Sequence, residues 1–154
     1  MLKWIDIPPV WLFSALALAW VQAVHLPVGL SFGSGIGAGA VDLLGGLLIG
    51  GGLVMIALAA MEFRRQRTTI VPHREAERLI TSGIFKRSRN PIYAGDALIL
   101  AGCILRWDAV LSLILVPVFV WIIERRFIVP EENRLRRKFR ADFARYCTKT
   151  RRWA

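Results

Sequence analysis

Four runs of apolar residues, separated by polar and strongly basic segments, limit what this chain can fold into. Residues 8–32 and 40–61 each exceed the roughly 20 residues that a helix needs to cross about 30 Å of hydrocarbon. Residues 92–107 reach only about 24 Å as a helix, and residues 109–128 are long enough. At 55% hydrophobic, the 154 residues carry more apolar surface than a soluble protein of this size can bury. The sequence therefore predicts an all-α polytopic membrane protein, a single membrane domain over residues 1–154 with four transmembrane helices.

The polar segments predict how these helices are connected. Only Trp107 and Asp108 separate the third run from the fourth, so we expect a tight turn and a helical hairpin. Pro117, in the middle of the fourth run, predicts a kink. Residues 62–91 are expected to form an ordered connector with a short helical piece at residues 74–81.

Charge predicts the orientation of the chain. The formal net charge is +10, but the cations are confined to a few segments: eight Lys and Arg lie in residues 62–91 and eleven in residues 124–154, whereas residues 27–39 hold none. The positive-inside rule then predicts a multi-pass protein with both termini in the cytoplasm and basic segments that face anionic lipid. Nucleic-acid binding is disfavoured, because no aromatic interleaving or known binding module accompanies the charge.

The N-terminal run also has features of a cleavable signal peptide, because Lys3 precedes it and Ala17-Leu18-Ala19 imitates a cleavage site. The apolar run continues to Phe32, so we expect the segment to be retained. Farther along, Gly46 and Gly50 form a G-x-x-x-G pattern, which predicts close helix packing in lipid.

Two clusters of polar residues could carry chemistry. Arg89-Asn90-Pro91 precedes the third apolar run: Asn90 is a good N-cap, Pro91 suits the first helical turn, and the free amides there attract an anion. Tyr93 follows, an aromatic with a polar tip. This is also what an ordinary interfacial helix start looks like.

The second cluster, Glu131 and Glu132, comes directly after Pro130. It opens an expected helix at residues 131–147, where the acids could simply favour the helix N-terminus. The apolar stripe of that helix predicts that it lies in the membrane interface with its cations toward the headgroups. The stripe consists of Leu135, Phe139, Phe143 and Tyr146.

The order of these parts resembles the isoprenylcysteine carboxyl methyltransferase and phospholipid methyltransferase group. The resemblance rests on T-x-x-x-P at residues 68–72, L-I-T-x-G-x-F at 79–85, R-N-P-x-Y-x-G at 89–95, E-E-x-x-L-x-x-x-F at 131–139 with Tyr146, and a closing Arg152-Trp153. It covers about the C-terminal 90 residues and implies a membrane-embedded methyltransferase that uses S-adenosylmethionine. It also implies a cofactor pocket that opens to the cytoplasm.

The resemblance also implies roles for individual residues. Leu79, Ile80 and Phe85 would line the pocket. Asn90, Pro91, Ile92 and Tyr93 would hold the cofactor, and Glu131 with Glu132 would accept hydrogen bonds from its ammonium or ribose hydroxyls. Asn90 stands where many members have histidine, and Arg140 stands where glycine is usual.

The acceptor determines which residues are expected to be catalytic. A carboxylate acceptor would need a cation to orient it, for which Arg126 is the first candidate and Arg137 the second. An amine acceptor would have to lose a proton, which Glu132 could take. Asp96 is an acid within an apolar run and thus a further candidate, unless it pairs with Arg89. No metal site is expected, because Cys103 and Cys147 lack a ligand-like spacing.

The sequence thus predicts a methyltransferase acting on a lipophilic acceptor taken from the bilayer: an isoprenylcysteine carboxylate, a phospholipid or another small hydrophobe. The alternative is a non-catalytic membrane adaptor whose basic segments bind anionic lipids. Membrane lipids are the expected partners, and the acceptor atom and oligomeric state are left open.

Overall fold

Helices make up nearly all of the regular structure. The computed structural model of the chain describes residues 6–26, 29–33, 36–66 and 79–153. In order, the elements are α1 (Pro8–His25), α2 (Ile36–Arg65), the 3-10 helix η2 (Gly83–Lys86), α3 (Pro91–Arg106), the 3-10 helix η3 (Val110–Ile114), α4 (Leu115–Ile123), the π-helical turn η4 (Glu124–Ile128) and α5 (Val129–Lys149). No β-strand occurs in the described ranges, so the all-α prediction is confirmed.

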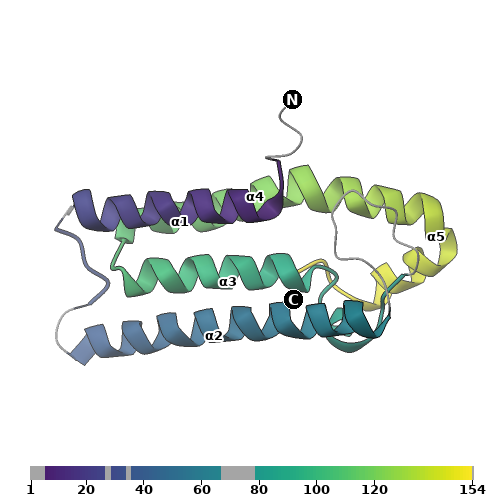
Figure 1. Cartoon of the computed structure of the whole chain (residues 1–154), viewed down its shortest axis with the longest axis horizontal. Coiled ribbons are helices and arrows are strands. Elements are labelled where there is room, and N and C mark those ends of the chain that lie inside the picture. Colours follow the sequence, from purple (N-terminus) through teal and green to yellow (C-terminus); the bar gives the residue numbers. More distant parts are fainter. Residues whose placement is uncertain (1–5, 27–28, 34–35, 67–78, 154) are drawn as a thin grey trace.

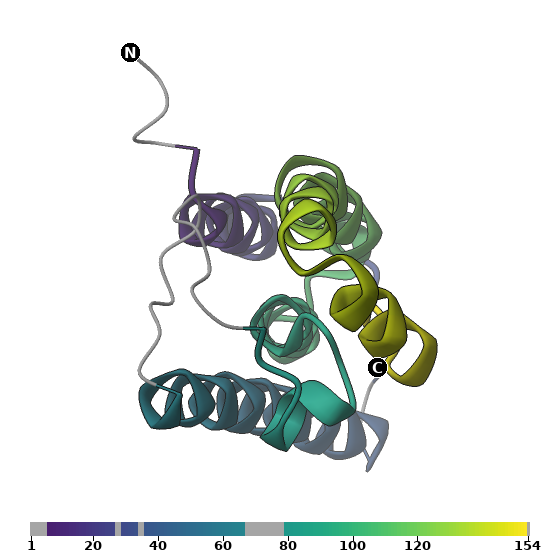
Figure 2. The same cartoon turned by 90° about the vertical axis from the view of Figure 1, so that its right-hand side faces the viewer.

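Helix α3 lies at the centre of an antiparallel bundle. It packs against α2 on one side and against α1 and α4 on the other (Figures 1 and 2). The end of α2, the start of α3 and all of α5 gather at one end of the bundle, and the turn after α3 lies at the other end (Figure 1). The described parts of the two basic segments, residues 62–66 and 79–91 and residues 124–153, therefore share one end, as the charge pattern predicts.

The helix boundaries differ from the predicted ones. Helix α1 ends at His25 and not at residue 32, because Leu26 leaves the helical conformation (φ −127°, ψ 65°) and Pro27 follows it in the sequence. Helix α2 is longer than the predicted 40–61 at both ends. Among the described helices, one is long and apolar enough to span a membrane by itself, at Gly37–Arg65. Four crossings are therefore not confirmed.

The outer surface of the bundle is rich in large apolar side chains on several helices. Phe13 on α1, Leu43 on α2 and Ile114 in η3 are 68%, 65% and 65% exposed. Similar exposed side chains follow along α1, α2 and α4: Leu18, Trp20, Leu47, Leu53, Val54, Met61, Val118 and Trp121. Soluble proteins rarely expose so much contiguous apolar surface, so this surface is suited to lipid.

The backbone stays helical from α4 into α5, which corrects the predicted separate helices at 109–128 and 131–147. Ile128, at the junction, has helical angles (φ −66°, ψ −52°). Pro117 is the third residue of α4, directly after a 3-10 segment, so it lies near a helix start and not at a mid-helix kink. The irregularity falls instead at the π turn η4. The acids Glu131 and Glu132 therefore do not occupy a free helix N-terminus.

Glycines let α2 and α3 approach one another closely. A Cβ on Gly52 would lie 2.5 Å from the Gly95 carbonyl oxygen, and one on Gly102 would lie 2.6 Å from that of Gly45. The predicted pair was wrong: Gly50 meets nothing within 4 Å, and Gly46 meets only a side-chain atom of Arg106 at 3.6 Å. The contacting glycines of each helix, Gly45 and Gly52 on α2 and Gly95 and Gly102 on α3, are seven residues apart, which keeps them on one helix face. The predicted pair, Gly46 and Gly50, does not lie on that face.

Replacing Gly52 by alanine should destabilise the bundle, because the new methyl group would meet backbone that cannot move without separating the helices. We expect a loss of about 1 to 3 kcal/mol, measured as a lower melting temperature in detergent. Gly50→Ala is the matched control on the same helix. It should be neutral or stabilising by up to about 1 kcal/mol, because alanine has the higher helix propensity and open space surrounds the site. Equal melting temperatures for the two variants would contradict the close packing.

Helix α5 bends at Arg140, whose backbone has φ 37° and ψ −108°. A positive φ is unfavourable for a residue with a Cβ and easy for glycine. The position that the resemblance marks as usually glycine is thus the one where the chain needs glycine-like angles.

Arg140→Gly should therefore stabilise the protein by about 1 kcal/mol, because it relieves the strained angles. Arg136→Gly, at an exposed helical position of the same helix, should destabilise it by about 1 kcal/mol. Thermal unfolding in detergent measures both. Destabilisation by both glycines would show that Arg140 is not strained.

Most of the predicted connector helix lies outside the described residues, as does the T-x-x-x-P element at 68–72. Residues 79–81, the end of that predicted helix, are described and are not helical.

Candidate functional site

The connector reaches α3 along the end of α2. Ile80 and Phe85 are buried in a small apolar cluster with Ala59, and the Phe85 ring meets Phe63 edge-on at a centroid distance of 5.5 Å. Ser82 donates a hydrogen bond to Glu62 near the end of α2. This anchoring fixes where the chain enters α3.

Helix α3 begins as predicted, with Pro91 in its first turn and fully buried. Asn90 occupies the N-cap position, but its side chain makes no capping bond. Its Nδ2 instead donates to the Arg152 carbonyl oxygen at 3.0 Å. The amides of the first turn are thus not covered by the Asn90 side chain.

Glu132 is the buried centre of an ion-pair network. Its Oε1 lies 3.2 Å from Arg89 Nη2 and accepts from Arg152 Nε at 3.2 Å, and its Oε2 accepts from Arg152 Nη2 at 2.7 Å. Arg152 Nη1 also reaches Glu124 Oε1 at 2.6 Å. Both oxygens of the Glu132 carboxylate are therefore occupied by arginine donors, which make charge-assisted hydrogen bonds.

Glu131, the next residue back, has no hydrogen bond or ion pair among the described residues and is accessible to solvent. It is nevertheless surrounded by protein on most sides, and desolvation raises the pKa of its carboxyl, with Glu132 adding to the increase and Arg134 opposing it. The charges of Glu131, Asp96 and Arg134 all act on the Tyr93 hydroxyl. Glu131 on α5 and Tyr93 on α3 therefore lie near enough for their charges to interact, and we call these two residues, with Asp96 and Arg134, the polar cluster.

The raised pKa of Glu131 means that its charged form costs folding stability above that pKa and nothing below the unfolded value of about 4.3. Glu131→Gln should therefore raise the melting temperature at pH 7.5, and the difference from wild type should vanish near pH 4. Glu132→Gln, the neighbouring control, should lower the melting temperature at pH 7.5, because it leaves two arginines without their shared partner. A lower melting temperature for Glu131→Gln at pH 7.5 would contradict the raised pKa of Glu131.

Arg89 and Asp96 add two groups that the sequence analysis left without a firm role. Arg89 Nε is buried without a hydrogen-bond partner in the described part of the chain, an unusual state for a charged donor. Asp96 is 8% exposed and, again among the described residues, has no ion pair, so it is not paired with Arg89. It lies one turn after Tyr93 on α3. Burial of these groups depends on tertiary contacts, which no local sequence signal reveals.

The two arginines predicted to orient a carboxylate acceptor, Arg126 and Arg137, are not among the ion-pair partners of Glu132 in the described part of the chain. Arg126 pairs with Asp6 at 2.9 Å and stacks over the Trp11 ring at 5.3 Å, so α1 and its preceding residues hold it. Arg137 is exposed and has no partner among the described residues. Leu79 is half-buried, and Ile92 packs between the two apolar clusters.

The end of α5 turns back onto the connector. Tyr146 is buried, its hydroxyl donates to the Phe85 carbonyl oxygen at 2.6 Å, and burial raises its pKa. Phe143 is 1% exposed. The prediction that these two rings face acyl chains was wrong, because the bend at Arg140 directs them against protein.

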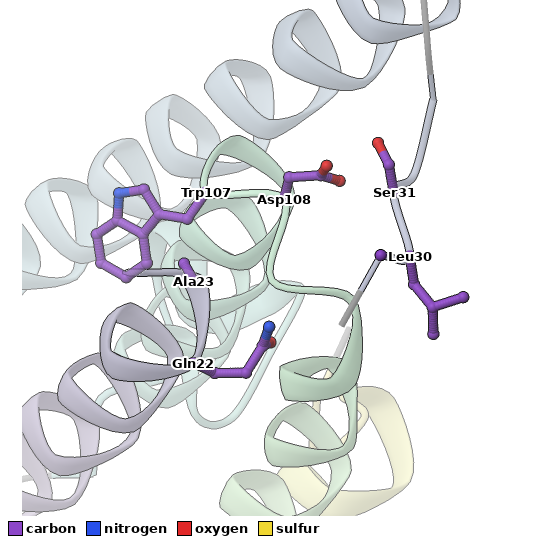
Figure 3. A pocket seen from close by; sticks show the side chains of 7 residues that line it. Gln22, Ala23, Leu30, Ser31, Trp107 and Asp108 are labelled. Atoms are coloured by element: carbon purple, nitrogen blue, oxygen red, sulfur yellow. The ribbon is translucent and has the colours of Figure 1, made fainter. Parts of the chain in front are cut away.

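A cavity of about 330 Å³ lies at the opposite end of the bundle (Figure 3). Gln22, Ala23, Leu30, Trp107 and Asp108 are among the residues that line it. The predicted tight turn is confirmed here: Asp108 adopts φ 53° and its carboxylate accepts from the Phe32 amide at 2.8 Å. This cavity is about one α3 length from Tyr93 and includes none of the predicted site residues.

The phospholipid methyltransferase family model matches residues 41–142. The chain belongs to this family. Membership makes it a methyltransferase of a membrane-associated, lipid-modifying family, and the matched region includes most of α2, all of α3 and α4, and both Glu131 and Glu132. No curated protein and no solved structure matches the chain.

Proposed function

We propose that this member of the phospholipid methyltransferase family is a polytopic membrane enzyme that transfers a methyl group from S-adenosylmethionine to a lipophilic acceptor. The observation that supports the proposal is the polar cluster, in which Glu131 is accessible, has no ion pair among the described residues and acts electrostatically on Tyr93 near the start of α3, at the basic end of an apolar bundle. With four crossings, both termini would lie on the cytoplasmic side, and the cofactor site would open there.

The polar groups at this end of the bundle fit the amino-acid portion of the cofactor. Its ammonium needs an anionic acceptor, which Glu131 supplies without breaking an existing pair. Its carboxylate needs a donor, which the unsatisfied Arg89 Nε and the free amides at the start of α3 supply.

Apolar residues complete the proposed site. Tyr93 and Ile92 would form the wall on α3, and Leu79, Ile80 and Phe85 would support it from the connector. Pro91 and Asn90 would fix the start of α3. Glu132, whose two oxygens are engaged by two arginines, would orient its neighbour and not bind the cofactor.

S-adenosylmethionine supplies, when bound, a methyl group that its sulfonium already activates. The residues of the chain then have to align the acceptor and exclude water. Asp96, buried and one turn deeper than Tyr93, would attract a cationic amine headgroup, take the proton that the nitrogen must lose before it can accept the methyl group, and repel a carboxylate. A carboxylate acceptor would instead depend on Arg126 or Arg137, and Arg126 is already neutralised by Asp6.

Calorimetry on the detergent-purified protein should show binding of S-adenosylmethionine. Glu131→Gln and Tyr93→Ala should each weaken binding at least tenfold, because they remove the ammonium acceptor and the α3 wall. Arg136→Ala, at an exposed position of α5, should leave cofactor binding unchanged and serves as the control. Incubation with methyl-labelled cofactor and a total membrane extract should yield a labelled lipid.

An adaptor that only binds anionic lipid would behave differently. It would show no heat of cofactor binding, and its attachment to anionic vesicles would be the same with or without Glu131→Gln and Tyr93→Ala. That pattern would reject the enzymatic proposal.

A further inference from the structure

The last residues of the chain run beside the segment that leads into α3. Arg151 forms a parallel bridge with Ser88, and its carbonyl oxygen accepts from the Arg89 amide at 3.0 Å. The next carbonyl, that of Arg152, accepts from Asn90 Nδ2. Residues 150–153, the C-terminal strap, thus pair with the start of the proposed cofactor site.

The Arg152 side chain joins two acids that are eight residues apart. Its Nε and Nη2 donate hydrogen bonds to the two oxygens of Glu132, and its Nη1 donates to Glu124 Oε1 in the π turn η4. Trp153 Nε1 donates to the other oxygen of Glu124 at 3.1 Å. The strap therefore spans the π turn and fastens its first residue to the first turn of α5.

These bonds of the strap matter because the direction in which the Glu131 side chain points depends on the register of α5. A π turn holds one more residue per turn than an α-helix and can change register by one position. A one-residue change rotates every later side chain by about 100° and would turn Glu131 away from Tyr93. The bidentate ion pair between Arg152 and Glu132, the residue next to Glu131, fixes that rotation.

We propose that Arg152 is a positioning residue of the cofactor site, which holds Glu131 opposite Tyr93 through Glu132 and Glu124. This inference rests on the proposed function. It adds a residue that lies ten positions beyond the region matched by the family model, residues 41–142.

The test compares Arg152→Ala, Arg152→Lys and Arg151→Ala in the full-length protein. Arg151 is the matched control, because its side chain is exposed and makes no described contact, whereas its backbone makes the same strap bonds. By calorimetry with S-adenosylmethionine, we expect Arg152→Ala to raise Kd about tenfold. Arg152→Lys should recover part of this affinity, since an ammonium can bind one carboxylate but lacks the planar array of N–H donors with which the guanidinium binds two. Arg151→Ala should match wild type.

A readout without cofactor accompanies the binding measurement. Hydrogen exchange should become faster in the first turn of α5 for Arg152→Ala and not for Arg151→Ala. If Arg152→Ala does not fold, Glu124→Gln provides the second variant: it loosens the strap, leaves the Glu132 pairs in place and should raise Kd about two- to threefold.

The outcomes separate the two proposals. If wild type binds the cofactor and Arg152→Ala binds equally well with only a lower melting temperature, the strap is a structural clamp and this inference is overturned. If wild type itself does not bind, the proposed function fails, and the positioning role fails with it.

Discussion

The ion pairs of the Glu132 carboxylate are the interactions on which the proposed functional end of the molecule depends. It is buried, and an ion of this kind is tolerated only when cationic donors replace the water that it has lost. The two donors come from the connector and from the C-terminal strap, so satisfying one charge brings together three segments that are far apart in the sequence. Removing either arginine would leave a partly uncompensated charge, which is why these segments cannot move independently of α5.

The glycine contacts between α2 and α3 supply the complementary constraint along the bundle. Because the backbones meet at Gly52 and Gly95, α3 has little freedom to slide or rotate against α2. The start of α3 is thereby held near the end of α2, where the connector cluster around Phe85 lies. Apolar packing therefore sets the depth of Tyr93 in the bundle, and the ion pairs set which face of α5 meets it.

Local chemistry made part of this predictable from the sequence. Proline at a helix start and a two-residue gap between apolar runs depend on neighbours in the chain, and both Pro91 and the Trp107-Asp108 turn are confirmed. The continuous path from α4 through η4 into α5 was missed, because Pro130 resembles a helix start and nothing in a sequence marks a π turn. The partners of Glu132 were missed for a different reason: Arg89 and Arg152 are 43 and 20 residues away, and ion pairing over such distances leaves no periodic signal.

Counting the charges of the network explains which polar groups are left over near it. Arg89 and Arg152 balance Glu124 and Glu132, so these four groups are neutral together. Within the described part of the chain, Glu131 then remains as a negative charge without an ion pair, and the Nε of Arg89 as a donor without an acceptor. In the proposed function, a ligand with both an ammonium and a carboxylate would satisfy the two groups, whereas an ordinary anion would meet repulsion from Glu131 and a simple amine would leave Arg89 unsatisfied. The leftover polarity is therefore of the kind that the proposed cofactor needs.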